Sequence, residues 1–186
     1  MQLGASPDLV SDGLAIAADE LRHSARCVEV FHAAGGTGAV PVDPSALVVD
    51  ATGDLVADLL KGVLRLFCLG ETLAVAMFAE ARTNASVPIA KDVLTEIVRD
   101  EVRHRAFGWD ALGWLLEQGI VATEQMHTQT QALIPDFAKW YPEPHADNIG
   151  ALERAWGLTP ASVAHQLVRR AIEHDWPRRL RTASRS

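Results

Sequence analysis

A five-residue phrase occurs twice in the chain and limits its fold more than any other feature. Residues 19–23 and 100–104 both read Asp-Glu-x-Arg-His, and Ile16 and Ile97 each lie four residues before the Glu. On an α-helix, residues three positions apart lie on the same face. Each copy of the phrase therefore places one carboxylate beside one imidazole on a helix. The competing interpretation is two charged faces turned to solvent, which the apolar residues on the same faces disfavour.

A single carboxylate interrupts the apolar run between the two phrases. From residue 62 to residue 79 the chain is apolar except for Arg65, Glu71 and Thr72. A buried carboxylate is costly unless it is paired with a cation or coordinates a metal. Two interpretations follow for Glu71: an ion pair with Arg65, Arg22 or Arg103, or a position in a metal site.

Carboxylate and imidazole together form a ligand set that suits transition metals. If the two phrases face each other and Glu71 enters from a neighbouring helix, five side chains converge. The predicted metal ligands are Glu20, His23, Glu71, Glu101 and His104.

Three further expectations concern residues in and near the predicted ligand set. The Asp and Arg of each phrase (Asp19, Arg22, Asp100 and Arg103) either hold the ligands by hydrogen bonds or are solvated at the surface. Cys27 and Cys68, one turn from His23 and Glu71, are expected to be small core residues. Gly108 is expected to leave space beside the metal.

These residues resemble the ferritin-like superfamily of di-iron and di-manganese carboxylate proteins. In that superfamily a four-helix bundle supplies one Glu from each of two helices and Glu-x-x-His from each of the other two. Glu71 with Glu101 and His104 matches the second half of this pattern, and Glu20 with His23 matches the latter part of the first half. The resemblance covers roughly residues 5 to 118, and the expected first helix has no counterpart.

The resemblance implies a pair of iron ions, or iron with manganese, that reacts with O₂. Glu71 and Glu101 would bridge the metals, and His23 and His104 would be terminal ligands. The implied activity is an O₂-dependent oxidoreductase or oxygenase acting on a small organic substrate or on iron. The alternative is a metal-free or partly metallated scaffold subunit. In either case we expect a homodimer or a second chain to cover the face of the missing helix, unless a C-terminal helix fills it.

Helical spacing of apolar residues predicts an all-α fold. Long helices are expected over 7–33, 54–82 and 88–118, with a long crossover loop at 35–53, and they form a bundle domain over 1–120. Residues 121–186 are expected to be a partly irregular helical extension of the same domain. In that extension we expect a helix over 123–134, a loop over 135–150, a turn or two near 149–156 and a helix over 160–176 that stops at Trp176-Pro177, followed by a frayed basic tail.

Charge and composition narrow the function further. The net charge of −7 disfavours broad binding to nucleic acid or to anionic membranes. Glu71 and Arg65 argue against a membrane span in the apolar run. Two cysteines do not make a disulfide scaffold, and no secretory signal is visible. We therefore expect a cytoplasmic protein.

Overall fold

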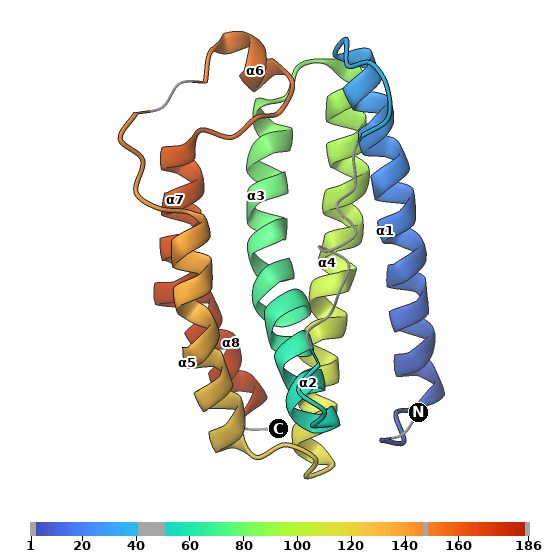
Figure 1. The fold of residues 1–186 in the computed structure, drawn as a ribbon, viewed down its shortest axis with the longest axis vertical. Helices are drawn as coiled ribbons and strands as arrows, with labels where there is room; N and C mark the ends of the chain where they lie inside the picture. Colours follow the sequence, from blue (N-terminus) through green and yellow to red (C-terminus); the bar gives the residue numbers. More distant parts are fainter. Residues whose placement is uncertain (1–2, 41–50, 147–148, 185–186) are drawn as a thin grey trace.

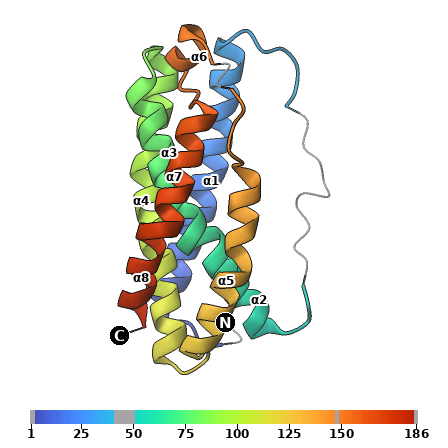
Figure 2. The same cartoon turned by 90° about the vertical axis from the view of Figure 1, so that its left-hand side faces the viewer.

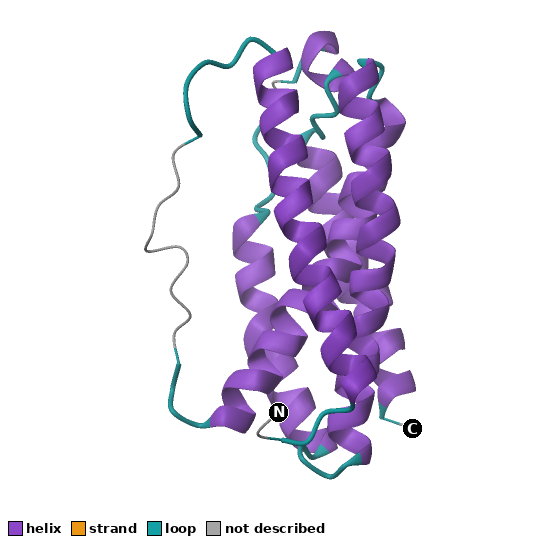
Figure 3. Ribbon diagram, turned by 90° about the vertical axis from the view of Figure 1, so that its right-hand side faces the viewer, coloured by secondary structure: helices purple, strands orange, loops and turns teal. Residues whose placement is uncertain are grey.

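The computed structural model describes residues 3–40, 51–146 and 149–184, and these ranges contain helices and loops but no strand (Figure 3). The predicted all-α class is confirmed for this part of the chain. The expected crossover at 35–53 falls partly on residues 41–50, which lie outside the described ranges.

Three long helical rods match the expected helices closely. They are α1 (Pro7–Ala33), α4 (Pro88–Glu117) and a continuous rod made of α2 (Leu55–Gly62), the π-helical segment η2 (Val63–Gly70) and α3 (Glu71–Asn84). Local chemistry sets their starts. The Ser6 hydroxyl accepts a hydrogen bond from the Leu9 amide at 3.2 Å, and Pro7 occupies the first turn. Asp54 caps α2 in the same way.

Neighbouring rods run in opposite directions, with α4 between α3 and α1 (Figure 1). α1 and α3 rise together, and α4 descends beside both of them. α1 packs extensively on α4 alone, whereas α4 also packs closely along η2 and α3. Most of the outer surface of α1 is therefore left uncovered by the described part of the chain.

Close packing of α4 on η2 requires Gly108. A Cβ atom at this position would lie 2.5 Å from Phe67 Cβ and 2.6 Å from the Phe67 carbonyl carbon. The expectation that Gly108 leaves space beside a metal is wrong, because the backbone of η2 fills that space. The glycine instead allows two helix backbones to approach each other.

The fourth helix is longer than expected. α5 (Thr123–Trp140) continues through Pro135, so the predicted loop from residue 135 is wrong over its first residues. Proline in a helix interior costs roughly 3 kcal/mol. The packing beyond it offsets this cost, because Phe137 is buried with its ring 4.9 Å from that of Trp176 and Trp140 lies under the Arg65 guanidinium.

The C-terminal helix also passes its predicted stop. α7 (Ala161–Arg170), the π-helical segment η3 (Ala171–Asp175) and α8 (Trp176–Ala183) form one continuous helical rod. Pro177 lacks an amide donor, and the altered hydrogen-bond register of η3 just before it accommodates that loss. The expected frayed tail is helical to Ala183, with Leu180 buried. The short α6 (Ala151–Ala155) confirms the predicted turns near 149–156.

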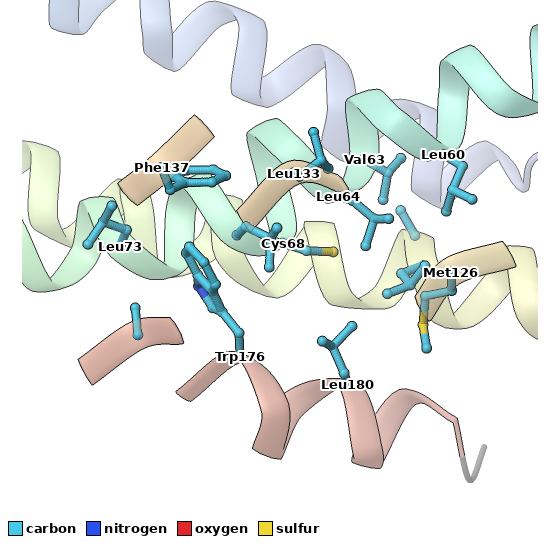
Figure 4. Close-up of a cluster of buried hydrophobic side chains, with 14 of the residues drawn as sticks. Leu60, Val63, Leu64, Cys68, Leu73, Met126, Leu133, Phe137, Trp176 and Leu180 are labelled. Atoms are coloured by element: carbon cyan, nitrogen blue, oxygen red, sulfur yellow. The ribbon is translucent and has the colours of Figure 1, made fainter. Parts of the chain in front are cut away.

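The main apolar core lies between these C-terminal helices and the central rods. Trp176, Phe137 and Met126 pack there against Leu64 and Leu73 (Figure 4). α5, α7 and α8 lie on the side of α3 that is turned away from α1 (Figures 1 and 2). The C-terminal helix therefore does not cover the face of α1 beside the predicted ligands.

The rod Leu55–Asn84 is long and apolar enough to cross a membrane, with a mean hydropathy of 1.6 over its most apolar window. Core helices of soluble proteins pass the same test. In this structure 33% of that window is buried, and Glu71 lies in the middle of the rod beside the carboxylates of Glu20 and Glu101.

Candidate metal centre

The two repeated phrases exchange hydrogen bonds across the α1–α4 contact. Nε2 of His23 lies 3.1 Å from Oδ2 of Asp100, and Nε2 of His104 lies 3.2 Å from Oδ2 of Asp19. Each histidine is thus held by the aspartate of the other phrase. The exchange is reciprocal because the helices are antiparallel, so residue numbers rise along one helix as they fall along the other.

Arginines surround the two aspartates on their outer side. Arg22 donates to Asp19 at 2.8 Å and to Asp100 at 2.6 Å. Arg103 donates to Asp100 at 2.6 Å and to Asp19 at 3.0 Å. Burial alone would raise the pKa of Asp100, but hydrogen bonds from Arg99, Arg103, His23 and Arg22 hold it well below its ordinary value. Both aspartates are therefore ionised acceptors.

An ionised aspartate can only accept, so Nε2 of each histidine carries the proton that it shares with Asp19 or Asp100. Nδ1 of each ring is then turned to the opposite side. Nδ1 of His104 lies 3.1 Å from Oε2 of Glu101 and 3.1 Å from Oε1 of Glu20.

The interpretation in which the Asp and Arg of each phrase are solvated at the surface is wrong for Asp19 and Asp100, which are buried.

Four of the five predicted ligands offer donor atoms to one point. Glu20, Glu71, Glu101 and His104 each place one ligand atom within 4.8 Å of those of the other three. His23 lies at the edge of this group, with Nδ1 3.9 Å from Oε2 of Glu20 and 3.8 Å from Oε1 of Glu101. This largely buried cluster of Glu and His could hold a metal ion.

The carboxylates of the cluster have no arginine or lysine partner. No such cation in the described ranges lies within 4 Å of Glu20, Glu71 or Glu101. Burial, a hydrogen bond with Glu101 and the charges of Glu101 and Glu20 raise the pKa of Glu71 to about 9. Burial opposes the charge of Glu101 as well, but hydrogen bonds from His104 and Glu71 lower its pKa. Without a metal, a proton on Glu71 therefore separates two facing carboxylates.

The alternative ion pairs for Glu71 are wrong. Arg65 lies over the Trp140 ring, 5.0 Å from its centroid, and Arg22 and Arg103 are engaged with the aspartates. Glu71 begins α3 directly after the π-helical segment η2. π-Helical turns are frequent at functional sites, where they change the direction of side chains.

The two cysteines near the cluster differ in burial. The Cys68 thiol is buried and donates to the Gly108 carbonyl oxygen at 3.1 Å. Cys27 is exposed, so the expectation that it is a core residue is wrong, whereas that expectation is confirmed for Cys68. A cavity of about 260 Å³ is lined by Asp19, His104 and Phe107, and by none of the three clustered glutamates.

Sequence reasoning missed Arg26 and Arg99, and it also missed the acceptor Glu96. It accepts from Arg22 at 2.8 Å and from Arg26 at 3.2 Å. Its position four residues before Asp100, on the same face of α4, was the only available signal.

A scan of protein-family models, a search of curated proteins and a search of solved structures each found no match.

Proposed function

We propose that the chain is a ferritin-like non-haem protein that binds a pair of iron ions, or iron with manganese, and acts as an O₂-dependent oxidoreductase. The proposal depends above all on three carboxylates that face one another with no arginine or lysine partner among the described residues, and with only the imidazoles of His23 and His104 beside them. Such an arrangement is expensive unless a metal or a proton compensates it. Oxygen donors with imidazole suit iron and manganese.

Glu20, His23, Glu71, Glu101 and His104 would hold the ions, which supply electrons to O₂ when reduced and bound. The residues around them have separate tasks. Asp19 and Asp100 would keep a proton on Nε2 of the histidines, so that Nδ1 would be the coordinating atom once it has lost any proton of its own. Glu71 would likewise have to give up its proton to become a ligand. The side chain of Glu20 is 52% exposed, so this edge would admit a small organic substrate or further iron.

Metal loading tests the proposal. The chain, stripped of metal and titrated anaerobically with ferrous iron, should bind roughly two ions and then consume O₂. Glu101→Ala should abolish both the binding and the O₂ uptake. Glu29→Ala, an exposed partner of Arg26 on α1, should change neither. Equal iron binding by the wild-type chain and Glu101→Ala would show that the carboxylate cluster is not a metal site.

The exposed face of α1 favours a second candidate function, a scaffold subunit that binds another chain. Leu14, Leu21 and Val28 are 69%, 75% and 36% exposed. They recur every seven residues and so lie on one face of the helix, beside Glu20. An apolar stripe of this kind favours a second copy of the chain or a helix of another protein.

Sedimentation velocity at micromolar concentration tests this second candidate. We expect the wild-type chain to associate and Leu21→Glu to be monomeric, whereas Leu152→Glu, which changes an equally exposed leucine on α6, should have no effect. A monomeric wild-type chain would refute self-association. Association without any iron binding would favour the metal-free scaffold over the oxidoreductase.

A further inference from the structure

A groove between α4 and α8 is separate from the carboxylate cluster and has a volume of about 500 Å³. The indoles of Trp109 and Trp114 line it from α4. Gly113 also lines it, and a Cβ atom there would meet nothing within 4 Å. The volume falls within the range of small-molecule sites.

The two walls of the groove carry opposite charges. Asp110 and Glu117 line it from α4, and Arg178 and Arg179 line it from α8. No ion pair within 4 Å joins either acid to either arginine, although the structure describes all four residues. Each wall therefore presents charges that are not neutralised by the wall opposite.

Arg179 lies close to other arginines. Burial, followed by the nearby charges of Arg105 and Arg178, lowers the pKa of Arg179, while the charge of Asp175 acts in the opposite direction. The Arg179 guanidinium lies 5.7 Å from the centre of the Trp109 ring, so the basic wall meets the indole. An anionic group placed against this wall would relieve the repulsion among these arginines.

We propose that this groove binds a small zwitterion of the α-amino-acid type with an apolar side chain. Arg178 and Arg179 recognise its carboxylate, Asp110 and Glu117 recognise its ammonium group, and the two indoles contact its apolar part. A simple anion would meet the acids of α4, and a simple cation would meet the arginines of α8. Only a ligand with both charges matches both walls.

Calorimetric titration of the metal-free chain with three related probes tests this inference. L-phenylalanine carries both charges, 3-phenylpropionate only the carboxylate and 2-phenylethylamine only the ammonium. L-phenylalanine should bind saturably, and each singly charged analogue should bind about tenfold more weakly, since a hydrogen bond to a charged group contributes about 1.5 kcal/mol or more.

Variants of exposed residues assign the binding to the groove without disturbing the fold. Arg178→Gln should weaken L-phenylalanine binding and remove its advantage over 2-phenylethylamine. Glu117→Gln should remove its advantage over 3-phenylpropionate. Lys91→Gln, which removes an exposed positive charge elsewhere on α4, should leave all three affinities unchanged. No saturable binding of L-phenylalanine, equal affinity for either analogue, or binding unaffected by both groove variants would overturn the proposal.

Discussion

Replacing Glu71 with Gln should stabilise the metal-free chain near neutral pH while it removes a metal ligand. The pKa of Glu71 rises from 4.5 to about 9 on folding because of burial and the neighbouring Glu101 and Glu20. Between about pH 4.5 and about pH 9 the folded chain therefore retains a proton that the unfolded chain gives up. The free energy of unfolding falls as the pH rises through this range. Glutamine imitates the protonated side chain at every pH.

The shift in the pKa of Glu71 sets the size of the expected gain in stability. Each pKa unit corresponds to about 1.4 kcal/mol, so the interval from the ordinary value to about pH 7.5 sets an upper limit of about 4 kcal/mol. Glu71 is only half-buried, and solvent screening brings the expected gain to about 2 kcal/mol. At pH 5, where the wild-type side chain is already largely protonated in the folded state, the gain should nearly vanish.

Urea denaturation with a chelator present, at both pH values, measures this difference. Glu80→Gln is the matched control, because Glu80 is also half-buried on α3 and accepts a hydrogen bond from Asn84 that glutamine can accept as well. We expect no pH-dependent gain for it. If Glu71→Gln is no more stable than the wild-type chain at pH 7.5, or gains equally at pH 5, the carboxylates do not oppose one another as argued.

Other substitutions test the hydrogen bonds and the helix packing around the carboxylate cluster. Asp100→Asn should destabilise the chain by about 3 kcal/mol in urea denaturation, because it removes the buried charged acceptor shared by His23 and three arginines, and should weaken iron binding at least about tenfold. Gly108→Ala should cost about 3 kcal/mol in the same assay, since its Cβ would meet the backbone of η2. Because the folded-state pKa of Asp100 is depressed, its contribution is present above its ordinary value of 3.8 and is lost below it, so helical circular dichroism should fall under about pH 4.

The long helices and most of the cluster were predictable because they depend on local patterns. Ser6-Pro7 and the periodic apolar residues fixed α1, and the Glu-x-x-His spacing put each Glu on the same face as its His. The third carboxylate, Glu71, was identified by its isolation in an apolar run. These inferences need only the helical period and the cost of burying a charge.

Features that depend on contacts between distant segments were not predictable. Pro135 and Pro177 were expected to end helices, but the burial of Phe137, Trp176 and Leu180 stabilises helices that continue past them. Asp100 binds His23 and Asp19 binds His104, and both hydrogen bonds depend on the antiparallel contact of α1 with α4. The π-helical register before Glu71 has no sequence signal of its own.

The measurement that tests the central claim most directly is anomalous X-ray scattering from crystals grown with ferrous iron or manganese. We predict anomalous density at coordination distance, about 2.0 to 2.3 Å, from carboxylate oxygens of Glu20, Glu71 and Glu101 and from Nδ1 of His104. Water or a side-chain contact at that point, with no anomalous density while metal is present in excess, would contradict the account.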